Sequence, residues 1–146
     1  AGVQLGTAFA VTQECDADPA FKRVLAGARP EDIVEFVSVA GLPARAVRTP
    51  WLDKYLRVEP KLKAVAHKKD RCNMAFDCLA QCGLRDGDAK VGQFCIDQQL
   101  GHAMQGHTDK GLFFRGAGRL PFGDQIRPVQ ELMQWLVGGI RPPALA

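Results

Sequence analysis

The chain has 146 residues, the usual size of one domain, with 47% hydrophobic and 24% charged residues. This balance excludes a wholly disordered chain. No apolar run approaches the roughly 18 residues that cross a bilayer, so the sequence predicts no membrane partner. A net charge of +3 is too small to indicate nucleic-acid binding.

The cysteine content indicates the compartment. Five cysteines cannot all pair within one chain, and the single asparagine, Asn73, is not in a glycosylation sequence. We therefore expect a reducing, cytoplasmic location. The chain opens without methionine on an apolar run, and a domain rarely begins with an unprotected buried strand. We expect it to be the tail of a longer protein.

The first third of the sequence predicts two strands and a helix. Val3–Val11 is typical of a buried strand that runs into a turn at Gly6-Thr7. Asp18-Pro19 supplies a cap and a first-turn proline for a helix over residues 20–28. The β-branched segment Ile33–Val39 predicts a second strand.

The rest of the sequence predicts mainly helices. Pro50 opens a short helix through Leu56, and three more helices are expected, the first closed by Gly83 and the other two predicted from their apolar spacing. These cover residues 72–82, 94–104 and 126–137, the last with its inner face at Val129, Leu132, Met133 and Leu136. Residues 111–123 are glycine-rich and irregular. The expected units are residues 1–49, a helical cysteine-bearing extension over 50–105, and a closing segment over 106–146.

Three segments resemble one family of flavoenzymes. Gly2-Val3-Gln4-Leu5-Gly6-Thr7-Ala8-Phe9 resembles the eighth-strand motif of the nitronate monooxygenase (2-nitropropane dioxygenase) family of FMN-dependent barrels. Gly41-Leu42-Pro43-Ala44-Arg45-Ala46 follows in the expected order. The closing segment, residues 106–136, is similar to that of the family and includes Ile126-Arg127-Pro128-Val129-Gln130-Glu131-Leu132.

The resemblance implies an α/β fold, the C-terminal part of a (β/α)8 barrel, with Gln4, Leu5, Gly6 and Thr7 holding the FMN phosphate. It implies nitronate oxidation with molecular oxygen, or NAD(P)H-dependent reduction of an acceptor such as a quinone. The small-molecule substrate would bind beside the flavin, and the remainder of the barrel would come from the same precursor or another chain. We expect the isolated chain to be inactive.

Other family features have no match in the sequence. The first seven strands and the catalytic histidine would lie before residue 1, and none of His67, His102 or His107 takes that histidine's place. The catalytic residues are therefore unknown. The usual Ala-Gly-Gln of the closing loop is replaced by Phe114-Arg115-Gly116-Ala117-Gly118-Arg119.

Four cysteines, Cys72, Cys78, Cys82 and Cys95, fall within 24 residues. On a helix Cys78 and Cys82 would lie on one face, about 6 Å apart. Four thiolates suit a [4Fe–4S] cluster or zinc. The alternative interpretation is that they are small buried hydrophobes.

Basic residues leave two alternatives open. Five arginines in loop-like surroundings would bind an anion or serve as surface charge: Arg45, Arg48, Arg115, Arg119 and Arg127. Residues 51–71 carry seven Lys or Arg against three Asp or Glu, typical of a solvated helical face. A second function class follows: a stand-alone cysteine-ligated metal module that docks an anionic partner through this basic stretch.

Overall fold

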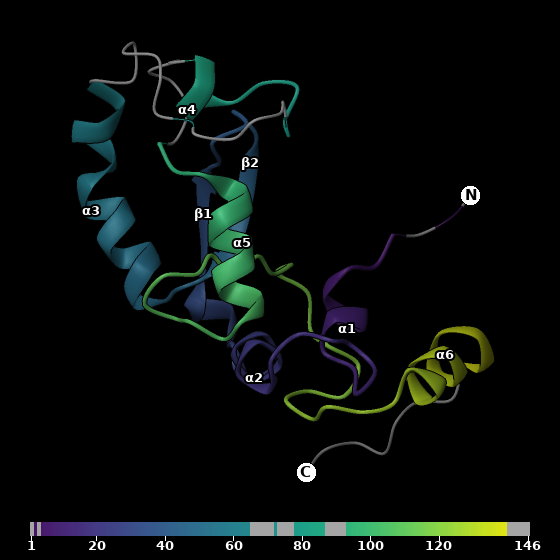
Figure 1. The fold of residues 1–146 in the computed structure, drawn as a ribbon. Coiled ribbons are helices and arrows are strands. Elements are labelled where there is room, and N and C mark those ends of the chain that lie inside the picture. The colour runs from purple at the N-terminus through teal and green to yellow at the C-terminus, as the bar shows by residue number, and fades with distance from the viewer. Residues whose placement is uncertain (1, 3, 65–71, 73–77, 87–92, 140–146) are drawn as a thin grey trace.

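The computed structural model describes residues 2, 4–64, 72, 78–86 and 93–139. Figure 1 shows their arrangement. The elements in chain order are α1 (Thr7–Ala10), α2 (Pro19–Gly27), the 3-10 helix η1 (Pro30–Asp32), β1 (Ile33–Val37), β2 (Pro43–Val47), α3 (Pro50–Ala64), α4 (Gly83–Asp86), α5 (Ile96–Met104) and α6 (Val129–Gly138).

The central feature is an antiparallel hairpin of β1 and β2. Its register runs from Ile33 opposite Val47 to Val37 opposite Pro43. Gly41 lies in the connection with φ 78°, a backbone conformation that favours glycine. The predicted strand at residues 33–39 is confirmed and ends two residues early. Together with the helices, this two-stranded sheet makes a mixed α/β fold. The described residues do not form the predicted barrel themselves.

The closing segment extends the hairpin. The amide of Val47 donates to the carbonyl oxygen of Phe113 at 2.9 Å, and the Arg115 amide donates to the carbonyl oxygen of Arg45 at 3.1 Å. A single antiparallel bridge joins Ala46 to Phe114 between these bonds. The irregular, glycine-rich loop predicted for residues 111–123 therefore runs along the open edge of β2.

Helix α2 begins where its caps predict. The Asp18 carboxylate accepts a hydrogen bond from the Ala20 amide at 2.7 Å, and Pro19 fills the first helical position. Leu25, on the predicted apolar face, is almost fully buried. The prediction of this helix is confirmed.

The predicted opening strand is wrong. Gln4, Leu5 and Gly6 are exposed, and helix α1 begins at Thr7. The amides of Phe9 and Ala10 donate to the Gly6 carbonyl oxygen at 3.1 and 3.0 Å. A strand needs a neighbouring strand for these groups, and the described residues supply none here, so the amides are satisfied locally.

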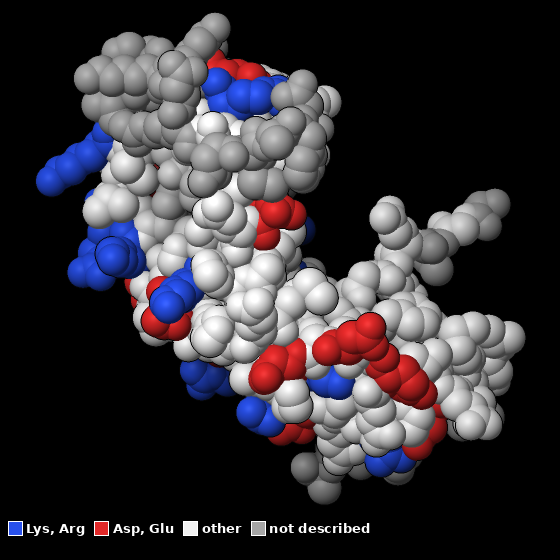
Figure 2. Space-filling model, viewed as in Figure 1, with Lys and Arg blue, Asp and Glu red and all other residues white. Residues whose placement is uncertain are grey.

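Helix α3 is longer than predicted and runs past Pro60 to Ala64. It continues because Leu56 and Leu62 still pack against the core, and Glu59 pairs with Lys63 at 2.9 Å one turn on. Lys54, Arg57 and Lys61 are exposed, and Figure 2 shows blue atoms along the α3 side. The basic stretch is thus a solvated face over the described part of α3.

The predicted helix over residues 72–82 is wrong where the structure describes it. Residues 79–81 form bends, Cys78 and Cys82 have no regular structure, and α4 begins at Gly83. The Asp86 carboxylate accepts a hydrogen bond from the Cys82 amide at 2.9 Å, which fixes the chain entering α4. The remainder of that predicted helix, residues 73–77, lies outside the described residues.

Helices α5 and α6 confirm the other two helical predictions, with starts two and three residues later than expected. Helix α6 is tied to the start of the chain, because the Glu14 carboxylate accepts the Val129 amide at 2.9 Å. Leu132 is buried as predicted, but Met133 is exposed, and Trp135 is partly buried instead. Val129 and Leu136 are partly buried, so the predicted inner face of α6 holds except at Met133.

Two hydrophobic clusters form the core. The first joins the hairpin, α3 and the segments beside α4 and α5; its buried residues are Phe36, Val39, Ala46, Leu52, Tyr55, Cys82, Phe94 and Leu112. The second joins α2, the end of β2 and α5; its buried residues are Val11, Leu25, Ala26, Val47, Ala103 and Phe113. No helix in the described ranges is long and apolar enough to cross a membrane.

Candidate functional site

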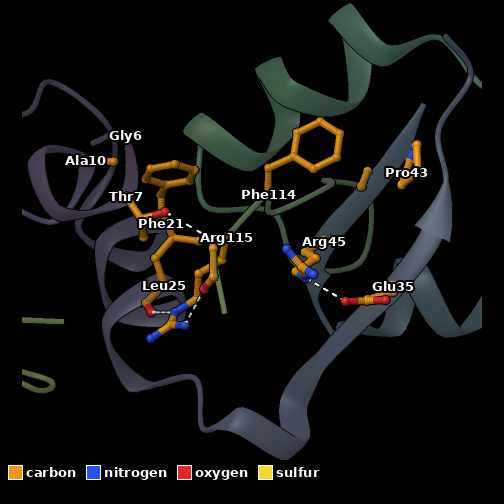
Figure 3. Close-up of a pocket in the computed structure, with 12 residues that line it drawn as sticks. Gly6, Thr7, Ala10, Phe21, Leu25, Glu35, Pro43, Arg45, Phe114 and Arg115 are labelled. Atoms are coloured by element: carbon orange, nitrogen blue, oxygen red, sulfur yellow. Dashed lines mark hydrogen bonds and ion pairs between the residues drawn. The ribbon is translucent and has the colours of Figure 1, made fainter. Parts of the chain in front are cut away.

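A cavity of about 570 Å³ opens where the three family-like segments meet. This volume is typical of a small-molecule site. Figure 3 shows Gly6, Thr7 and Phe21 on one side, the hairpin residues on the other, and the Phe114–Arg115 segment between them. The complete lining is Gly6, Thr7, Ala10, Phe21, Leu25, Glu35, Pro43, Ala44, Arg45, Phe114, Arg115 and Gly116.

One hydrogen bond joins the opening motif to the closing loop. The Gly116 amide donates to the Thr7 hydroxyl oxygen at 3.2 Å, across 109 residues of sequence. The Thr7 hydroxyl proton is left to donate elsewhere, since a hydroxyl both donates and accepts. A Cβ built on Gly116 would meet only this hydroxyl, at 3.8 Å. The backbone at the junction is thus open to a ligand.

Arg115 anchors the closing loop to helix α2. Its Nε donates to the Leu25 carbonyl oxygen at 2.7 Å, and its Nη1 donates to those of Gly116 at 2.7 Å and Gly118 at 3.4 Å. The residue is 7% exposed, and burial lowers the pKa of its guanidinium. Arg115 therefore holds the wall of the cavity rather than serving as surface charge.

Arg45 and Glu35 form the polar rim of the same cavity. They are register partners in the hairpin, and Arg45 Nε lies 2.6 Å from Glu35 Oε1. Both side chains are more than half exposed. Figure 3 shows this pair on the strand side, away from the Arg115 guanidinium.

The four sequence-predicted cofactor residues line a second cavity, of about 430 Å³. It adjoins the first, and Gly6, Thr7 and Gly116 line both. Arg119 also lines it, is exposed, and donates to no acceptor among the described residues. The full lining is Gln4, Leu5, Gly6, Thr7, Ala8, Gly116, Gly118, Arg119, Leu120, Pro121, Trp135 and Leu136.

The structure does not gather the predicted metal ligands. No group of three or more His, Cys, Asp or Glu side chains able to hold a metal occurs among the described residues. Cys82 is buried in the first hydrophobic cluster, whereas Cys78 is exposed, and Cys72 and Cys95 are intermediate. This pattern fits the alternative interpretation, packing, for Cys82.

The remaining candidate side chains lie outside the cavities. Arg48 pairs with Asp53 at 3.7 Å, and Arg127 pairs with Glu131 at 2.6 Å. Sequence reasoning missed Phe21 and Glu35 as lining residues. Neither residue could be recognised from the sequence, because an aromatic residue on a helix face is usually part of the core and an acidic residue in a strand usually faces solvent.

The fold resembles part of a solved enzyme. The chain matches the structure of a FabK mutant from Thermotoga maritima with a TM-score of 0.58 and 23% sequence identity. The match covers 94% of this chain and 33% of that one, so the chain spans a third of the length of FabK. No curated protein matches the sequence.

The family is settled by the sequence. The nitronate monooxygenase family model matches residues 1–139, nearly the whole chain. The chain belongs to the nitronate monooxygenase family. The resemblance drawn from its three motifs is confirmed, and the match includes the cysteine-bearing middle, which a stand-alone metal module does not explain.

Proposed function

We propose that these residues form part of the cofactor and substrate site of an FMN-dependent oxidoreductase. The rest of a (β/α)8 barrel, from the same precursor or another chain, would complete the site. One observation carries the proposal: Gln4, Leu5, Gly6 and Thr7 line a single cavity with the closing loop, 109 residues away. Membership of the nitronate monooxygenase family supplies the reaction class.

The donors around the smaller cavity fit a phosphate group. Within the described residues the amides of Gly6, Thr7 and Ala8 donate to no acceptor, and the Thr7 hydroxyl proton is free. Arg119 adds an uncommitted guanidinium. A Cβ built on Gly6 would meet nothing within 4 Å, so the backbone is open to close approach. Backbone amides and an arginine are the usual ligands of a phosphate.

Apolar surfaces adjoin these donors. Trp135, Leu136 and Leu120 line the smaller cavity, and Phe21 and Phe114 line the larger one. Bound FMN would supply the hydride and electron chemistry, while the protein binds and orients it. The reaction we propose is oxidation of a nitronate with molecular oxygen, or transfer of reducing equivalents from NAD(P)H to an acceptor such as a quinone.

Substitution of Gly6 tests the phosphate site. Gly6 has φ −99° and ψ −64°, which valine also adopts, so Gly6→Val leaves the backbone unstrained while filling the space beside the amides. Losing one or two charged hydrogen bonds, at about 1.5–3 kcal/mol each, weakens FMN binding tenfold or more. Gly101→Val is the matched control, because Gly101 has equally open space and lines neither cavity.

The measurement is the dissociation constant of FMN beside that of riboflavin, which lacks the phosphate, by quenching of flavin fluorescence. Protein made from the complete gene is used, so that any further barrel strands are present. We expect wild type and Gly101→Val to prefer FMN and Gly6→Val to lose that preference. Equal FMN affinity in wild type and Gly6→Val contradicts the proposal.

A further inference from the structure

The larger cavity is apolar over most of its lining. Ala10, Phe21, Leu25 and Phe114 contribute hydrocarbon surface, while the Arg45–Glu35 pair stands on the hairpin. The charged residues of the lining are Arg45, Arg115 and Glu35, which leaves a net positive charge. A largely apolar chamber whose lining carries a net positive charge suits a ligand that has an aliphatic body and an anionic head.

Of the two arginines, Arg45 has both terminal nitrogens without an acceptor among the described residues, whereas Arg115 has only Nη2. The Nε of Arg45 is bonded to Glu35, and its Nη1 and Nη2 donate to no acceptor among the described residues. Arg115 is buried, and its Nε and Nη1 donate to three backbone carbonyl oxygens. Anchoring of Arg45 at Nε also orients the guanidinium, so that its two terminal nitrogens form a pre-set pair.

We propose that Arg45 binds the head group of the substrate, a planar anion with two oxygens, and that the cavity holds the substrate's aliphatic tail. Two N–H groups of a guanidinium match two oxygens of a nitronate or a carboxylate in a bidentate geometry. Glu35 orients Arg45 and also reduces the positive potential that an incoming anion meets. The assignment of this anion as substrate rests on the proposed function; the binding site itself does not.

Glu35 sets which anions are accepted. A carboxylate beside the guanidinium opposes any incoming negative charge, and it opposes a dianion more than a monoanion. The rim therefore favours singly charged head groups over a phosphate. This separates the larger cavity from the smaller one, where Arg119 has no acidic partner among the described residues.

The test measures binding of hexanoate, of the nitronate of nitrohexane, and of uncharged hexanol to the purified protein by calorimetry. Arg45→Met should weaken binding of both anions about tenfold or more and leave hexanol unchanged. Glu35→Gln should strengthen anion binding several-fold. Arg48→Met is the matched control: Arg48 is a similarly exposed arginine three residues on, outside the cavity, and its loss should change nothing.

The variants keep the fold intact, because an exposed ion pair contributes only about 0–1 kcal/mol to stability. Equal anion affinity in wild type and Arg45→Met overturns the assignment, as does an equal loss in Arg48→Met or in hexanol binding. In the flavin-loaded enzyme, Arg45→Met should raise KM for the nitronate more than it lowers kcat. If hexanoate binds through Arg45 but FMN does not bind, the anion site stands and the proposed function fails. If only hexanoate requires Arg45, the head group is a carboxylate.

Discussion

Replacement of Arg115 by methionine should loosen the closing loop. The methionine keeps the aliphatic stem and removes the guanidinium, which makes two hydrogen bonds of 2.7 Å to the carbonyl oxygens of Leu25 and Gly116. Hydrogen bonds from a charged group contribute about 1.5–3 kcal/mol each, or roughly 3–6 kcal/mol for the two. The cost of burying the charge, which also lowers the guanidinium pKa, offsets part of this.

We therefore expect Arg115→Met to lower the free energy of unfolding by about 2–4 kcal/mol. With a urea m value of about 2 kcal/mol/M, the unfolding midpoint should fall by roughly 1–2 M. Arg127→Met is the control, since the exposed Arg127–Glu131 pair contributes at most about 1 kcal/mol. Equal midpoints for the two variants would refute the anchoring role of Arg115.

Three further predictions follow from burial. Gly111→Ala should destabilise the protein by about 1–3 kcal/mol, because its Cβ would lie 2.5 Å from the backbone nitrogen of Ala103. Gly101→Ala, in open space on a helix, should stabilise it by about 0.5–1 kcal/mol, and the thermal unfolding midpoints of the two variants test both values. Cys82→Ser should cost about 1 kcal/mol or more and Cys78→Ser almost nothing, while metal analysis that found iron or zinc lost equally from both would contradict packing. Tyr55 is the only tyrosine, and burial, ahead of the charge of a nearby glutamate, raises its pKa; its neutral form stabilises the fold fully below pH 10.0 and less as the pH rises further, so phenolate absorbance should appear only with loss of native circular dichroism.

Local signals in the sequence were enough for the helices with clear starts and faces. Asp18-Pro19 is a cap and a first-turn proline that act within a few residues, so α2 begins where predicted. Strand β2 was missed because Pro43, Ala44 and Arg45 have little β propensity, and pairing with β1 overrides it. For the opening segment the prediction was wrong in the opposite sense. Its apolar pattern is typical of a strand, but its amides donate to the carbonyl oxygens of Gly6 and Thr7 in a short helix.

The candidate site was only partly predictable for a related reason. The Gly6-Thr7 motif and the loop arginines were visible in the sequence, as were the segments that carry them. Which arginine is structural depends on contacts across the fold: Arg115 bonds to Leu25, 90 residues away. No spacing rule separates Arg115 from Arg45, because both stand in Gly/Pro-rich surroundings and differ only in what the fold places beside them.

The two cavities share a wall that is formed by residues of the opening motif and of the closing loop. Gly6, Thr7 and Gly116 line both, and the Thr7–Gly116 hydrogen bond lies between them. Arg115 holds the loop that carries Gly116, so a change at Arg115 should weaken phosphate and substrate binding together. A change at Arg45 reaches only the larger cavity. If the cavities share a wall but have separate binding groups, Arg115→Met should weaken the binding of both FMN and the substrate anion. Arg45→Met should weaken only the binding of the substrate anion.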